Sequence, residues 1–185
     1  LLVVGAAGGV GSILAQIARR LTSLRVIGTA SREDSRRWVE ELGAHDVIDH
    51  SLPLAAQVRA LVPDGVTWIA SLTQTDLHWS ELVEALAPQG AIAVIDDPGP
   101  IDVRALKPKS AALHWELMFT RSLFGTPDQD AQGRLLQEVA HLVDNGVIRS
   151  TQGEHYGRID AANLRAAHER IESGRMRGKA VLSGW

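Results

Sequence analysis

The sequence contains no cysteine among its 185 residues, which excludes disulfide bonds and metal sites built on thiolates. It has no block of basic residues, and its net charge of -3 favours neither a nucleic acid nor an anionic membrane as a partner. The apolar runs are too short to span a bilayer, and the apolar start lacks the basic flank of a signal peptide. From these absences we expect a cytoplasmic protein.

Short apolar runs alternate with helical patterns through the first half of the chain. Runs that suit buried parallel strands occur at residues 1–4, 25–30, 46–49, 66–72 and 91–95. Helical patterns separate them at 12–21, 33–42, 54–62 and 76–86. The alternation predicts an α/β fold, namely a Rossmann-type doubly wound parallel sheet of about six strands with helices on both faces.

Polar residues predict where two of these helices begin. Ser31 and Asp34 have the spacing of a capping box before the second helix, and Asp76 is a candidate N-cap for the fourth. Asp96 and Asp97 precede a Pro-Gly-Pro turn, which explains them better than a paired acid and base. Later in the chain, residues 110–120 fit either a sixth strand or a short helix. Further helices are expected at 128–145 and 161–173, and extended segments at 147–156 and 179–183.

The turn between the first strand and the first helix has the spacing Ala6-x-Gly8-x-x-Gly11. A small residue at Ala6 permits a tight turn, Gly8 lets the backbone approach a diphosphate, and Gly11 lets the helix pack close to the strand. The N–H groups of Gly9, Val10 and Gly11 at the start of the helix favour negative charge. The turn therefore predicts a dinucleotide site, and the alternative is a turn that serves packing alone.

The end of the second strand bears on which dinucleotide binds. A carboxylate at this position would hold the ribose hydroxyls of NAD, but the sequence has Ala30, followed by Ser31 and Arg32. A hydroxyl and a planar guanidinium suit a 2′-phosphate, so we predict NADP (NADPH). Glu33 and Asp34 oppose this reading with their charge, and Ser31 and Arg32 could instead be a helix cap and a solvated surface cation.

Several stretches resemble the medium-chain dehydrogenase/reductase superfamily. They are VVGAAGGVGSILAQIARRL at 3–21, typical of the quinone-oxidoreductase-like branch, EELGAHDVIDH at 40–50, and LRAAHERIESGRMRGKAVL at 164–182. A further stretch, KPKSAALHWELMFTRSLF at 107–124, is similar to members described as zinc-binding alcohol dehydrogenases. The resemblance implies an oxidoreductase that transfers a hydride between nicotinamide and a carbonyl, quinone or enone substrate.

The resemblance also implies how the chain is organised. Family members carry a β-rich catalytic domain before this point, so the chain corresponds to their C-terminal portion and is expected to be inactive by itself. Residues 1–121 would form the dinucleotide-binding Rossmann domain, and residues 122–185 would pack back towards the catalytic domain. A homodimer through the sheet edge at the sixth strand is implied as well.

The resemblance places further cofactor contacts at the carboxyl ends of the strands, where ligands of open α/β sheets bind. The nicotinamide would lie near Ser71, Leu72 and Phe119, and Lys179 matches a position that can approach the cofactor phosphates. The stretch SLTQTD replaces the family's usual Asp-x-x-Gly. We predict no catalytic residue in this chain.

We also predict no metal ligand, because no pair among the seven histidines has ligand spacing. His45 and His50 flank a short strand and are expected at the surface.

Other readings of the sequence compete with this one. A non-catalytic nucleotide-binding or redox-sensing Rossmann module shares the glycine turn and stays open as an alternative. A methyltransferase-like fold would want an acid where Ala30 stands. A short-chain dehydrogenase would want a lysine four residues after Tyr156, where Asp160 stands. Gly8 to Gly11 also lacks the serine of a nucleophile elbow.

Overall fold

A parallel six-stranded sheet forms the centre of the computed structural model, which describes all of residues 1–185. Its strands are β1 (Leu2–Val4), β2 (Ile27–Thr29), β3 (Asp46–Ile48), β4 (Val66–Ser71), β5 (Leu86–Val94) and β6 (Ala112–Trp115). They lie in the order β3-β2-β1-β4-β5-β6, with every neighbouring pair parallel. The predicted Rossmann-type sheet is confirmed, and its switch point lies between β1 and β4.

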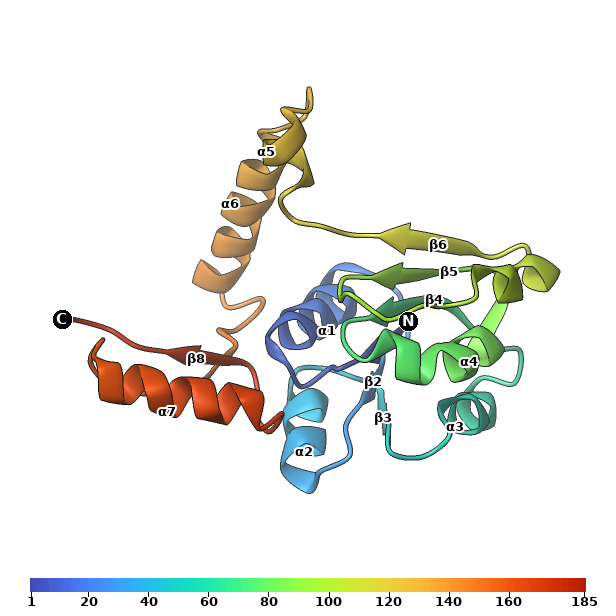
Figure 1. The fold of residues 1–185 in the computed structure, drawn as a ribbon, viewed down its shortest axis with the longest axis horizontal. Coiled ribbons are helices and arrows are strands. Elements are labelled where there is room, and N and C mark those ends of the chain that lie inside the picture. Colours follow the sequence, from blue (N-terminus) through green and yellow to red (C-terminus); the bar gives the residue numbers. More distant parts are fainter.

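Helices cover both faces of this sheet (Figure 1). On one face lie α1 (Gly9–Leu21) and α2 (Glu33–Glu41), and on the other lie α3 (Leu54–Leu61) and α4 (Thr75–Ala85). Side chains alternate between the two faces of a strand, so the neighbours Leu2 and Val3 of β1 enter different cores. Leu2 packs with residues of α3 and α4, whereas Val3 packs with residues of α1 and α2. An unbroken apolar strand therefore supplies both layers.

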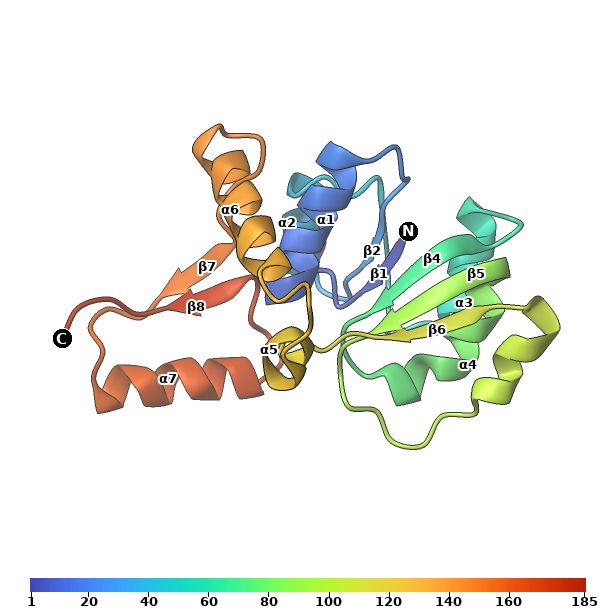
Figure 2. The ribbon, with the colours of Figure 1, turned by 90° about the horizontal axis from the view of Figure 1, so that it is seen from above.

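The undecided stretch at 110–120 contains β6 and the start of a helix, because the chain leaves the sheet after Trp115. The remaining elements are the 3-10 helix η1 (Val103–Lys109), α5 (Thr120–Phe124), α6 (Ala131–Asp144), β7 (Gln152–His155), α7 (Ala161–Glu172) and β8 (Lys179–Val181). β7 and β8 pair in parallel as a separate two-stranded sheet. Figures 1 and 2 show α1 and α2 between this pair and the large sheet.

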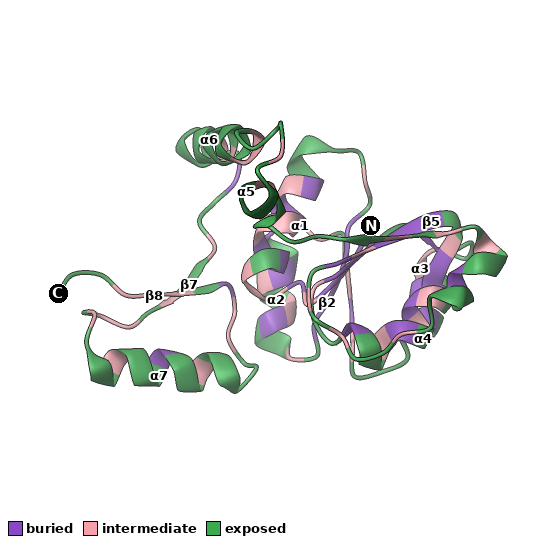
Figure 3. Cartoon of the chain, turned by 45° about the horizontal axis from the view of Figure 1, so that its top comes forward, coloured by how far each residue is buried: buried purple, intermediate pink, exposed green.

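Burial is concentrated in the first part of the chain (Figure 3). The two apolar clusters consist of residues from β1 to η1, whereas α5, α6 and α7 are mostly exposed. Large apolar side chains lie exposed in this later part, among them Leu117, Met118, Phe119, Leu123, Phe124, Leu135 and Leu136. No helix combines the length and the apolar character needed to cross a membrane.

Polar contacts attach the C-terminal elements to α1 and α2. The ring of Trp38 in α2 has the guanidinium carbon of Arg149 at 5.5 Å and that of Arg177 at 5.9 Å, which are cation–π distances. The Gln16 side chain donates to the Arg149 carbonyl at 3.1 Å and accepts from the Arg149 N–H at 2.8 Å. These contacts hold the chain after α6 against the α1–α2 face.

The predicted capping box before α2 is wrong. The residue before the helix is Arg32, not Ser31, and it has no side-chain cap. The Asp34 carboxylate accepts a hydrogen bond from the adjacent Ser35 N–H at 2.8 Å. A local contact of this kind competes with the reciprocal capping pattern that the spacing suggested.

The predicted cap of α4 is wrong as well. The helix follows Gln74, whose φ of 53° is left-handed. Its first N–H, that of Thr75, donates to the carboxylate of Asp96 at 3.0 Å, and the Thr75 hydroxyl donates to the same carboxylate. Asp96 follows β5, so the cap comes from a neighbouring strand rather than from Asp76. Asp96 is therefore more than a turn residue.

We expect Asp96→Ala to destabilise the chain by about 1–2 kcal/mol, because it removes the cap of α4. Asp76→Ala is the matched control, since Asp76 accepts only from its neighbour Leu77 and weakly from Gly99. Asp76→Ala should lower the free energy of unfolding by no more than about 0.5 kcal/mol, as for most surface changes. Urea unfolding followed by circular dichroism measures both, and equal losses would show that Asp96 is not the cap.

Candidate functional site

The glycine turn joins β1 to α1 at the carboxyl end of the sheet. Gly5 has a φ of +78°, a conformation that L side chains rarely adopt. A Cβ at Gly11 would lie 2.6 Å from the Cα of Ala6, so the close contact of helix and strand requires glycine there. At Gly8 a Cβ would meet only the Gly5 carbonyl, at 3.4 Å. Gly11 therefore serves packing, and Gly8 leaves its backbone accessible.

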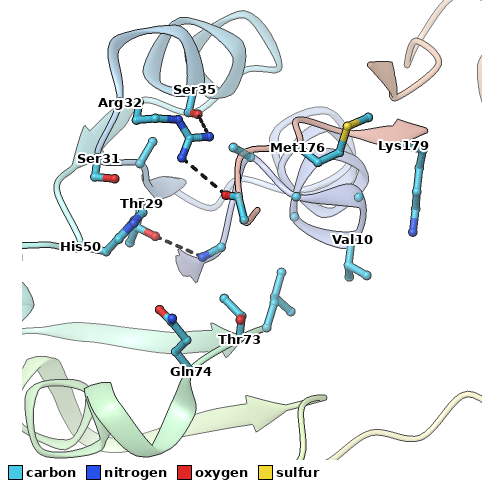
Figure 4. A pocket seen from close by; sticks show the side chains of 18 residues that line it. Val10, Thr29, Ser31, Arg32, Ser35, His50, Thr73, Gln74, Met176 and Lys179 are labelled. Carbon is cyan, nitrogen blue, oxygen red and sulfur yellow. Dashed lines mark hydrogen bonds between the residues drawn. The ribbon is translucent and has the colours of Figure 1, made fainter. Parts of the chain in front are cut away.

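A cavity of about 440 Å³ opens over this turn (Figure 4). Most of the predicted cofactor contacts line it. These are Gly8, Gly9, Val10, Gly11, Ser31, Arg32, Leu72 and Lys179. They come from the turn, from the loop after β2, from the loop after β4 and from the start of β8, so the fold brings together residues from both ends of the chain.

Three predicted contacts lie outside the cavity wall. Ala6 is fully buried beneath the turn. Ser71 is also fully buried, and its hydroxyl shares a hydrogen bond of 2.7 Å with the Thr75 hydroxyl. The side chain of Ser71 therefore supports the start of α4. Phe119 lies just before α5 with 53% of its surface exposed, because the chain has left the sheet after β6.

Lys179 reaches the turn because the backbone before it pairs with the turn. The Gly178 N–H donates to the Ala7 carbonyl at 2.8 Å, and Gly178 forms a parallel bridge with Gly8. The Lys179 ammonium nitrogen lies 2.6 Å from the position that a Cβ of Gly9 would take. A cation therefore lies over the N-terminus of α1, where the helix dipole and free N–H groups also favour an anion.

Arg32 lines the cavity but also contacts the C-terminal strap, by which we mean residues Gly174–Lys179. Its guanidinium donates to the Arg175 carbonyl at 3.2 Å, to the Gly174 carbonyl at 3.5 Å and to the Ser35 hydroxyl at 3.0 Å. Arg32 therefore attaches the strap to the loop after β2, while 38% of its side-chain surface stays exposed.

The Asp34 carboxylate lies 3.5 Å from the Arg32 guanidinium and 3.6 Å from that of Arg177. Desolvation raises the pKa of Asp34, but the Ser35 N–H and the charges of Arg32 and Arg177 outweigh it and bring the pKa below its ordinary value. Asp34 is therefore ionised at neutral pH and partly offsets the charge of Arg32.

Several residues of the cavity wall were not predicted from the sequence. They include Thr29, Ser35, His50, Thr73, Gln74, Gly174 and Met176. His50, Thr73 and Gln74 follow β3 and β4, so the rule that ligands bind at strand ends could have found them. His50 was expected at the surface and is instead half-buried. Its pKa is lowered by burial above all, while the Asp49 carboxylate acts in the opposite direction.

The charges around the cavity favour an anion. Its wall contains three side chains that carry or can gain a positive charge, namely Arg32, His50 and Lys179, and it contains no carboxylate. No three His, Asp or Glu side chains converge anywhere in the chain in a way that could hold a metal ion. The residues of this chain therefore do not fit a zinc site.

Comparisons with known proteins agree with this geometry. The family model described as zinc-binding dehydrogenase matches residues 42–182. A zinc-type alcohol dehydrogenase-like protein of Staphylococcus aureus is 34% identical over 186 residues, which cover 98% of this chain and 54% of that protein. A mouse quinone oxidoreductase is 29% identical over 98% of this chain and 54% of its own length. The chain thus spans about half the length of the curated relatives it matches.

Solved structures are similar over the whole chain. A protein from Rhizobium etli, described as a candidate zinc-dependent alcohol dehydrogenase, is 52% identical with a TM-score of 0.96, and the match covers 100% of this chain and 54% of that one. A mycobacterial protein solved with NADPH is 27% identical with a TM-score of 0.82, over 99% of this chain and 56% of that one. The family model, the relatives and the fold agree, and the chain therefore belongs to the zinc-binding dehydrogenase family.

Proposed function

We propose that this chain is the NADP(H)-binding part of an oxidoreductase that transfers a hydride between nicotinamide and a carbonyl, quinone or enone substrate. The observation that carries the proposal is the cavity over the glycine turn, where free backbone N–H groups lie beside Arg32, His50 and Lys179 without any carboxylate. Such a site suits a ligand that carries several phosphate charges.

The residues of the chain bind and orient the cofactor. Gly8 and the N-terminus of α1 hold the diphosphate, with Lys179 above them, and the strap closes one side of the cavity. The nicotinamide, when bound, supplies the hydride chemistry. No acid or base for proton transfer lines the cavity apart from the cations already named, so we propose that the isolated chain binds cofactor but turns over little or no substrate.

The preference for NADPH follows from the loop after β2. Ala30 lines the cavity where NAD-binding folds place a carboxylate, and Ser31, Arg32 and Ser35 line it beside Ala30. Asp34 opposes a phosphate at Arg32, although its charge is shared with Arg177. Relatives of both kinds exist, since one solved structure holds NADPH and another is described as an NAD-dependent alcohol dehydrogenase.

We also propose that the chain works as a homodimer through the edge of its sheet and that residues 122–185 pack on a further part of the enzyme. β6 is an edge strand, so its outer side is unpaired, and Trp115 at its end is 60% exposed. The exposed apolar side chains of α5 and α6 support a covered position for the later segment.

A non-catalytic nucleotide-binding module is the second candidate, because the cavity wall holds no general acid or base of its own besides His50 and Lys179. It predicts the same cofactor binding without any hydride transfer, even when the chain is joined to the parts found in its longer relatives. Assay of such a longer protein with NADPH and quinones would separate the two candidates.

We expect Gly8→Val to weaken NADPH binding by about 100-fold or more, since a side chain there would block hydrogen bonds to the diphosphate, each worth about 1.5–3 kcal/mol. The fold should survive, because the space beside Gly8 contains only the Gly5 carbonyl at 3.4 Å. Fluorescence titration and thermal unfolding measure the two effects. Unchanged binding by a folded variant would mean that the turn serves packing alone.

We expect the chain to bind NADPH about 10- to 100-fold more tightly than NADH, the range of one or two hydrogen bonds to a charged group. Arg32→Ala should remove most of this difference and leave NADH binding nearly unchanged. Since Arg32 also holds the strap, Asp34→Asn is the matched variant: it removes the opposing charge, keeps Arg32, and should widen the difference. Equal affinities of the unmodified chain for both nucleotides would refute the preference.

A further inference from the structure

His50 lies at the end of the cavity where the phosphate-specific contact is proposed. It follows β3 and shares the cavity wall with Ser31 and Arg32. Figure 4 shows these three residues at one end of the cavity, with Val10 and Lys179 at the other. Lys179 lies over the helix N-terminus, where the diphosphate is expected. His50 instead lies beside the loop after β2, where the 2′-phosphate is expected.

The ring of His50 is free to meet a ligand. Two other histidines have a ring nitrogen engaged within the chain, since His45 accepts from the Val26 N–H and His155 shares a hydrogen bond with Ser183. The nearest aromatic neighbour of His50 is His78 of α4, with ring centroids 6.5 Å apart and planes at 66°. An edge-on ring of this kind supports the position of His50 without using a hydrogen bond.

Charged groups face His50 from each neighbouring element. Asp49 precedes it in the same loop, Arg32 faces it from the loop after β2, and His78 faces it from α4. Glu81 acts on His78, and Arg36 acts on Asp49. Burial lowers the pKa of both histidines, and Arg32 and His78 add to this effect at His50. Without a ligand, His50 is therefore neutral at pH 7 and gains a proton only in more acidic solution.

We propose that His50 is a specificity-determining residue for NADPH, whose imidazole takes up a proton when the cofactor binds and donates it in a hydrogen bond to the 2′-phosphate. The inference rests on the proposed function and adds a property to it, namely that NADPH binding is linked to a proton. A nearby dianion favours the charged imidazole and offsets the cost of burying it. NADH has no 2′-phosphate, so its binding should involve no such proton.

The experiment is calorimetric titration of the 185-residue chain with NADPH and with NADH at pH 6, 7 and 8, in two buffers of different ionisation enthalpy. For NADPH at pH 7 we expect an uptake of about half a proton, and for NADH none. The ratio of the two dissociation constants should rise about tenfold in favour of NADPH from pH 8 to pH 6, which corresponds to one added charge-assisted hydrogen bond. His50→Gln should abolish both the uptake and most of the rise.

His78→Gln is the matched control, because His78 contacts His50 but does not line the cavity. Since His78 lowers the pKa of His50, this variant should keep the proton uptake and move it to higher pH. The 2′-phosphate itself titrates near pH 6 and contributes its own proton change. The contribution of His50 is therefore measured as the difference in proton uptake between the unmodified chain and each variant.

A measurement on the unmodified chain tests the proposal even if the His50 variant fails to fold. Proton NMR should show the pKa of His50 rising on addition of adenosine 2′,5′-bisphosphate and staying nearly constant with adenosine 5′-phosphate. The same pKa with both nucleotides, or the same proton uptake in His50→Gln as in the unmodified chain, would overturn the proposal for His50 while leaving NADPH binding intact. Failure of the unmodified chain to bind either dinucleotide would instead refute the proposed function.

Discussion

The close contact between α1 and β1 is the constraint on which the site depends. Gly11 lies so near Ala6 that no side chain fits between them, and this contact fixes the helix N-terminus at the carboxyl end of the sheet. Strands on either side of β1 end at the same edge, so the loops after β2 and β4 face the same turn. A larger residue at position 11 would move the helix and with it the N–H groups of its first turn, where a negative charge is favoured.

The charges around the cavity support the proposed preference for the more highly charged dinucleotide. The absence of a carboxylate from the cavity wall and the presence of Arg32 and Lys179 give the wall a positive character, to which His50 adds when it is protonated. Without a ligand, the Arg32 guanidinium already contacts Asp34, Ser35 and two carbonyls of the strap. Under the proposed preference for NADPH, a phosphate at Arg32 would share the guanidinium with these groups, so its binding would depend on the position of the C-terminal strap.

The C-terminal part differs physically from the sheet. Its attachment relies on polar and cation–π contacts around Trp38 and Gln16, whereas the sheet and α1 to α4 enclose two apolar cores. Contacts of the polar kind contribute less free energy than burial of large apolar side chains. The strap, which Arg177 and Arg32 attach through contacts of this kind, is therefore held less strongly than the glycine turn.

The sequence by itself determined the succession of strands and helices and the glycine turn, because these follow from local periodicity and from the conformations that glycine permits. Only the tertiary structure decided that Asp96 rather than Asp76 caps α4, that Ser71 is buried, and that Arg32 holds the strap. It also placed His50 and Met176 in one cavity wall. These contacts join residues that are distant in the chain, and pairing at a distance leaves no periodic trace in a single sequence.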